Sequence, residues 1–221
     1  MKKSTKIHAI SLAIASVALL SATSASAYSV TVGGVNPANG TGLHTAVAGA
    51  VETTFDSGIL PANYTGGAVV AGSLTNHYAS PPNDKTAFLT AGPDSPIQSS
   101  PITISLSAMS KYFGFYGGSP DSYNSVQLWR DGVELVSFSG TYLASIAGVA
   151  PNGNQGVGAY WNIWATNASQ YFNEVKFLST SNAFETDNHA VSSVPLPASL
   201  PLLLSGLGVL GFARRKKQTE I

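Results

Sequence analysis

The pattern that most constrains the fold is a series of short apolar and polar alternations separated by turn-forming residues. From Ile102 to Ser107 every second residue is aliphatic and the others are Ser or Thr, so a strand there has one apolar face and one polar face. The runs Asn124–Trp129 and Val133–Phe138 flank Asp131-Gly132, a dipeptide that favours a tight hairpin turn. No stretch between the two chain ends sustains helical periodicity over ten residues with caps.

Other alternating or β-branched runs extend this pattern along the chain, and clusters of Gly, Pro and Asn separate them. The further strand candidates are 28–32, 46–55, 68–74, 111–116, 142–146, 160–165, 174–178 and 188–191. About ten short strands with such turns predict an all-β fold, a two-sheet β-sandwich of jelly-roll type over residues 28–192.

Charge and cysteine content narrow the classes of function. Ten acidic and four basic residues lie between Tyr28 and Val194, a formal charge of −6 for this segment. A segment with so few cations has no basic stripe for a phosphate backbone, so nucleic acid is not an expected partner. The absence of cysteine excludes a disulfide framework, a thiolate zinc site and a cysteine nucleophile.

The N-terminal segment, residues 1–27, has the pattern of a secretory signal peptide. Lys2, Lys3 and Lys6 precede an apolar stretch that ends in small residues at Ala25-Ser26-Ala27. The apolar run is nearer a dozen residues than the ~20 that span a membrane, which favours a cleaved signal over an uncleaved anchor. Cleavage after Ala27 would make Tyr28 the first residue of the mature chain.

The C-terminal segment, residues 193–221, has three parts in a fixed order. These are the motif Val194-Pro195-Leu196-Pro197-Ala198, a hydrophobic transmembrane segment with three glycines, and the basic end Arg214-Arg215-Lys216-Lys217. The positive-inside rule keeps the basic end in the cytoplasm and leaves the preceding domain outside the membrane. A plain membrane anchor is the alternative, but an anchor does not require the Pro-Leu-Pro entry.

This order resembles the PEP-CTERM sorting signal in its Val-Pro-Leu-Pro-Ala variant. Two internal segments, Tyr112–Asn124 and Ser181–Asn188, also resemble the extracellular β domain of PEP-CTERM surface proteins. The resemblance implies recognition by an exosortase-type membrane protease or transpeptidase and transient anchoring in the inner membrane. It further implies delivery to the cell surface or the extracellular matrix, and it brings no catalytic residues with it.

Two side-chain sets are candidate binding sites. Asp121, Glu185 and Asp187, with Asn124 and Asn188 near them in sequence, offer the oxygen ligands that Ca²⁺ prefers; the alternative is ordinary turn chemistry. A second set, Trp129, Trp161 and Trp164, would form a platform for sugar rings if the three indoles shared one exposed face. Strand alternation requires some of these rings to be buried instead.

Catalytic patterns are few. His44, His77 and His189 are isolated in the sequence, and no nucleophile elbow, zinc-protease motif or phosphate-binding loop is present. Glu185 and Asp187, two residues apart, would mimic a glycosidase pair only if both faced a cleft. The sequence therefore predicts a non-enzymatic exported surface or matrix protein associated with polysaccharide or biofilm. A carbohydrate-binding module and, after it, a secreted hydrolase are the alternatives.

Overall fold

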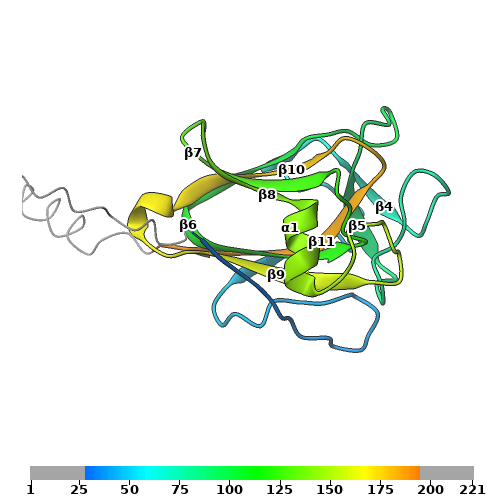
Figure 1. Cartoon of the computed structure of the whole chain (residues 1–221), viewed down its shortest axis with the longest axis horizontal. Coiled ribbons are helices and arrows are strands. Elements are labelled where there is room, and N and C mark those ends of the chain that lie inside the picture. The colour runs from blue at the N-terminus through cyan, green and yellow to red at the C-terminus, as the bar shows by residue number, and fades with distance from the viewer. Residues whose placement is uncertain (1–27, 195–221) are drawn as a thin grey trace, which may run out of the picture.

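The computed structural model describes residues 28–194 (Figure 1). The predicted signal peptide and all but the first two residues of the predicted tail lie outside the described residues. The helical elements of this range are α1 (Gly140–Ala147) and the short 3-10 helix η1 (Ala168–Gln170). The strands are β1 (Tyr28–Val32), β2 (Val51–Thr53), β3 (Tyr64–Thr65), β4 (Ala68–Ala71), β5 (Ala87–Ala91), β6 (Ile102–Gly118), β7 (Asn124–Arg130), β8 (Val133–Ser139), β9 (Gly158–Ala165), β10 (Phe172–Ser179) and β11 (Phe184–Ser193).

All the described strands belong to one antiparallel sheet that curls into two layers (Figure 1). The long strand β6 takes part in both layers. Its first half pairs with β10, which continues through β7 to β8, and its second half pairs with β9 and β11. The predicted all-β fold is confirmed, and the two layers of the sandwich are two parts of one hydrogen-bonded sheet.

The core between the layers consists of aromatic and branched aliphatic side chains from both halves of the sheet. Phe115 of β6 stacks on Trp161 of β9 with 5.3 Å between ring centroids. Phe177 of β10, in the opposite layer, meets Phe115 edge-on at 5.1 Å. These three rings are completely or almost completely buried, and edge-to-face and offset contacts of this kind stabilise cores beyond the burial of apolar area. A chain without disulfides thus has a dense aromatic core.

The β7–β8 hairpin confirms the turn predicted at Asp131-Gly132. Asp131 has φ 51° and Gly132 has φ 81°, so both central residues have the positive φ of the primed turn that suits twisted antiparallel strands. The inward residues of β7, Val126 and Leu128, are fully buried. The alternation in the sequence therefore determines both the register and the buried face of this hairpin.

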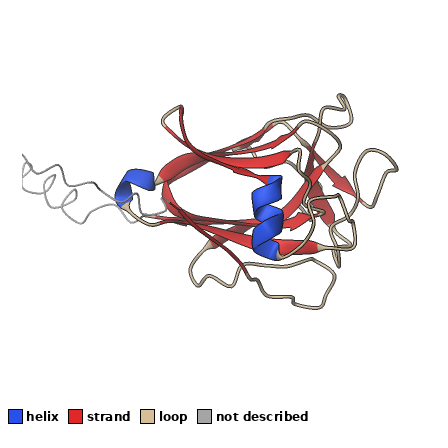
Figure 2. Ribbon diagram, viewed as in Figure 1, coloured by secondary structure: helices blue, strands red, loops and turns tan. Residues whose placement is uncertain are grey.

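The prediction of a strand at residues 142–146 is wrong, because these residues belong to helix α1. The Ser139 side chain caps the helix by accepting a hydrogen bond from the Tyr142 N–H, and Gly148 ends it with φ 70°. The helix lies at the open side between the layers (Figure 2) and buries Leu143 and Ala144. Leu143 also accepts a hydrogen bond from the Trp161 indole N–H at 3.0 Å, so α1 is attached to the core.

The run predicted as one strand at 46–55 is mostly irregular, and only β2 is a strand there. Residues 33–45, which lie between β1 and β2 and are called the covering segment below, cover the outer face of β6 and β9. The Thr45 hydroxyl lies 2.9 Å from the Tyr112 hydroxyl, and Asn162 donates its amide N–H to the Gly33 carbonyl at 2.7 Å. The covering segment buries polar groups on the outer face of the layer that contains β9.

Within residues 28–194 no helix is long and apolar enough to cross a membrane.

Candidate functional site

A pocket of about 550 Å³ opens at one end of the sandwich. It is formed by the segment 73–79 between β4 and β5, the β6–β7 turn at 119–123, the loop 152–155, and the β10–β11 turn with the start of β11 at 182–185. Its lining is dominated by hydroxyl, amide and aromatic side chains with two carboxylates, and it contains no Lys or Arg. The loops that form it lie at the right-hand end in Figure 1.

Glu185 supports one wall of the pocket from a nearly buried position, with 3% of its surface exposed. Its Oε1 accepts a hydrogen bond from the Ala79 N–H at 2.8 Å, and its Oε2 accepts one from the Ser119 hydroxyl at 3.3 Å. Burial raises the pKa of Glu185 to about 7. Because both carboxylate oxygens are engaged by the protein, Glu185 holds the 73–79 loop against β11 and the β6–β7 turn.

Asp121 and Tyr123 of the β6–β7 turn also line the pocket. The backbone of Asp121 bridges to Asn152, and burial raises the pKa of the Asp121 carboxyl. The Tyr123 hydroxyl donates to the Asn182 carbonyl at 2.8 Å. These bonds connect three of the four segments that line the pocket, so they hold its wall together.

A polar network behind the pocket could not be found from local sequence patterns. Gln98 donates to the His77 carbonyl and to the Asn182 side chain, both at 3.0 Å, and the His77 ring bonds to Asp94. Gln98 and Asn182 are 84 positions apart in the chain. Their pairing follows from the folding of the sheet, and no spacing rule predicts it.

The three carboxylates proposed from the sequence as calcium ligands do not lie together. Asp121 and Glu185 line the pocket, whereas Asp187 is absent from its lining and is completely buried elsewhere on β11. Glu185 and Asp187 consequently do not form a glycosidase-like pair across this pocket. Within residues 28–194, no three acidic, histidine or cysteine side chains gather into a metal-binding group.

The three tryptophans proposed as a sugar platform are also separated. Trp161 is 1% exposed and lies in the core. Trp129 lies half-buried on β7 under the Lys176 ammonium, which is 3.7 Å from the ring centroid. Trp164 packs against Tyr112 on the outer side of β9 at 4.4 Å. Because β7 and β9 belong to different layers, the indoles share no common surface.

The histidines are not isolated in the structure. His189 is buried among Phe113, Phe177 and Tyr64, and burial lowers its pKa to about 3. It is therefore neutral at physiological pH and serves as a core residue.

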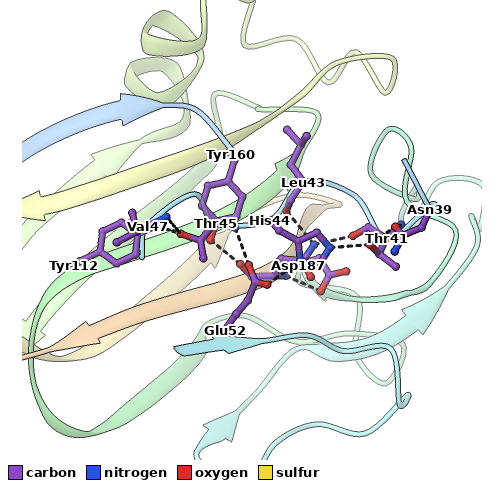
Figure 3. Close-up of polar contacts among 11 residues, drawn as sticks. Asn39, Thr41, Leu43, His44, Thr45, Val47, Glu52, Tyr112, Tyr160 and Asp187 are labelled. Atoms are coloured by element: carbon purple, nitrogen blue, oxygen red, sulfur yellow. Dashed lines mark hydrogen bonds and ion pairs between the residues drawn. The ribbon is translucent and has the colours of Figure 1, made fainter. Parts of the chain in front are cut away.

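His44 connects a hydroxyl and a carboxylate (Figure 3). Its Nε2 lies 2.7 Å from Thr41 Oγ1 and its Nδ1 lies 2.7 Å from Glu52 Oε2. A hydroxyl, an imidazole and a carboxylate in contact in this order resemble a hydrolase triad. However, the Thr41 hydroxyl donates to Asn39 Oδ1 at 2.7 Å. The backbone N–H groups at 41, 42, 44 and 45 are also engaged within the protein, so they are not free to stabilise an oxyanion. The chain of bonds fastens the covering segment to β2.

The described residues thus define an all-β domain with a polar pocket at one end. The chain continues into a sorting signal, since residues 193–217 match the PEP-CTERM protein-sorting motif. The sorting tail predicted from the sequence is confirmed. The protein is exported, is anchored transiently in the membrane through this motif and is then displayed at the surface, and the motif implies processing by the membrane enzyme exosortase.

Among solved structures, the chain is similar to the K2 cleaved adhesin domain of Lys-gingipain. The match has 12% sequence identity and a TM-score of 0.43, and it covers 65% of this chain and 99% of that domain. A TM-score below 0.5 does not establish a common fold or a common function. No curated protein matches the chain.

Proposed function

We propose that the mature protein is a non-enzymatic component of the cell surface or extracellular matrix that binds polysaccharide through the pocket at the end of its sandwich. The coarse part of this proposal, an exported surface protein, rests on the PEP-CTERM motif. The pocket supports the more specific part, which is the binding of polysaccharide.

The observation that carries the proposal is the position of the pocket relative to the sorting motif. Ser193, the residue before the Val194–Ala198 segment, pairs with Ser110 in the middle of β6. Thr186 pairs with Gly117 near the far end of β6, next to the pocket residues Ser119 and Glu185. Seven steps along β6 lead from Ser110 to Gly117, which corresponds to about 23 Å. A chain attached through its C-terminus would therefore present the pocket on its far side.

The lining of the pocket is chemically suited to a neutral polyhydroxyl ligand. Amide and hydroxyl side chains such as those of Thr75, Asn152 and Gln155 can donate and accept hydrogen bonds with sugar hydroxyls. Tyr78 and Tyr123 contribute ring surface to the same pocket, and aromatic rings pack well on the apolar faces of sugars. The absence of Lys and Arg from the lining argues against a phosphorylated ligand.

The experiment compares binding of the exported protein to matrix polysaccharide from the producing cells and to a glycan array. The variant Thr75→Ala/Gln155→Ala removes two exposed polar side chains of the pocket. Each hydrogen bond contributes about 0.5–1.5 kcal/mol, so we expect roughly tenfold weaker binding. Thr54→Ala changes an exposed threonine away from the pocket and is the matched control.

Unchanged binding in the double variant would place the ligand elsewhere on the surface. Absence of binding to every glycan tested would leave the surface assignment standing and remove the polysaccharide from the proposal. Release of reducing sugar from the polysaccharide by the unmodified protein would contradict the non-enzymatic assignment.

A further inference from the structure

A bulge in β11 brings two consecutive polar residues to one buried place. Asp187 pairs with Tyr116 but Ala190 pairs with Gly114, so three steps along β11 match two along β6. Asn188 takes up the extra residue with φ 50°. Successive residues of a regular strand point to opposite faces, and a bulge breaks this alternation. Asp187 and Asn188 are both 0% exposed.

Two loops, at residues 41–43 and 84–86, close over this bulge. The Asn188 amide nitrogen donates to the carbonyls of Thr41 and Leu43 at 2.7 and 3.0 Å, and Figure 3 shows this loop beside Asp187. Thr41 also bridges to Asp84 of the second loop. Oδ1 of Asp84 accepts hydrogen bonds from the N–H and hydroxyl of Thr86. These contacts bring the loop at 41–43, the loop at 84–86 and the bulge of β11 together.

Three oxygen atoms of these residues receive no hydrogen bond as long as both carboxyl groups are ionised. They are Asp84 Oδ2, Asp187 Oδ2 and Asn188 Oδ1, and all are inaccessible to solvent. The orientation of the Asn188 amide is fixed because its nitrogen donates to two carbonyls, so its oxygen cannot be exchanged for a donor. A buried polar group without a partner destabilises the folded state, and a charged group does so more strongly. Three such atoms at one place need an explanation.

The two carboxyls are close enough to interact directly. Without a bound cation, one carboxyl would have to keep a proton and donate it to the other. None of the ion pairs in the part of the chain described by the structure includes Asp84 or Asp187. The pair must therefore share a proton or hold a cation.

We propose that Asp84, Asp187 and Asn188 are ligands of a structural Ca²⁺ ion that joins the two covering loops to the bulge of β11. Ca²⁺ takes six to eight oxygen ligands from carboxylates, amides and backbone carbonyls, and every orphaned atom here is an oxygen. Zn²⁺ is disfavoured because it is usually bound by Cys and His, and Mg²⁺ because it keeps several waters. The carbonyls of Thr41 and Leu43 lie at the same place as a source of further oxygen atoms. This site is separate from the pocket, and the inference does not depend on polysaccharide binding.

The test measures the melting temperature of the exported protein in a chelator and in CaCl₂. Extracellular calcium modules have Kd values of about 10⁻⁴–10⁻³ M, so about 10 mM CaCl₂ is up to a hundredfold excess. At that excess, preferential binding to the folded state should raise the melting temperature by about 5–10 °C. The same concentration of MgCl₂ should have a much smaller effect.

Asp187→Asn should abolish this response to CaCl₂. The variant need not be less stable in the chelator, because it also removes a buried carboxylate that lacks a counter-charge, so loss of the response is distinguishable from failure to fold. Asp131→Asn also removes one negative charge, at the exposed β7–β8 turn, and should keep the full response. A melting temperature that is the same in chelator and CaCl₂ would overturn the proposal and assign a shared proton to the pair. An equal response in Asp187→Asn would overturn it as well.

Discussion

Replacing Gly132 with Val tests whether the positive φ at the β7–β8 turn stabilises the fold. A Cβ atom at this position would meet no other atom within 4 Å, so a steric clash does not contribute. The cost is the strain of an L-residue at φ 81°, about 1–2 kcal/mol in the left-handed region and up to ~3 for a β-branched residue. The lower backbone entropy of the unfolded variant offsets about 0.4–1 kcal/mol. We expect a net destabilisation of about 1–2 kcal/mol.

Thermal unfolding followed by circular dichroism measures this change. For a domain of this size, a loss of 1–2 kcal/mol lowers the melting temperature by about 2–8 °C. Gly132→Asn is the matched control, because Asn also fills the open space but tolerates positive φ, and it should lose much less. Equal melting temperatures for glycine, asparagine and valine at position 132 would refute the reasoning from backbone strain.

Two further predictions concern the core and the chain ends. Trp161→Phe removes the indole hydrogen bond to Leu143 and leaves a smaller ring in the core, so it should cost about 1–3 kcal/mol in thermal unfolding. Trp129→Phe on the half-buried outer face should cost less than about 1 kcal/mol, and equal losses would contradict the assignment of Trp161 to the core. Intact mass of the surface-extracted protein should correspond to a chain from Tyr28 to the Val194–Ala198 motif, whereas retention of Arg214–Lys217 would show a permanent anchor.

Local patterns in the sequence predicted the elements whose determinants are themselves local. The hairpin at Asp131-Gly132 is an example, since both its turn residues and its alternating strands are contiguous. Helix α1 was missed because it is only eight residues long, below the length at which periodicity is distinctive. Its signal was the cap pair, a Ser at 139 and a Gly at 148, rather than its apolar spacing.

The candidate sites were less predictable, because they depend on contacts between distant segments. Strand spacing placed Glu185 and Asp187 on the same side of β11, but their neighbours come from different loops. Glu185 meets the Ala79 loop and Asp187 meets Asp84. The bulge at Asn188 has no local signature in the sequence beyond an asparagine, which is one of the few residues other than glycine that tolerate positive φ.

The pairing of β11 with its neighbours has a mechanical consequence for a chain held at its C-terminus. Tension between a bound ligand at the pocket end and an attachment after Val194 would act along the axis of β11. The ladder bonds to β2, β5 and β6 lie across that axis, so such tension loads many of them in shear at the same time. Peeling a strand from its edge would instead break them one after another. The strand that leads to the sorting motif is therefore the one best placed to resist being pulled out of the domain.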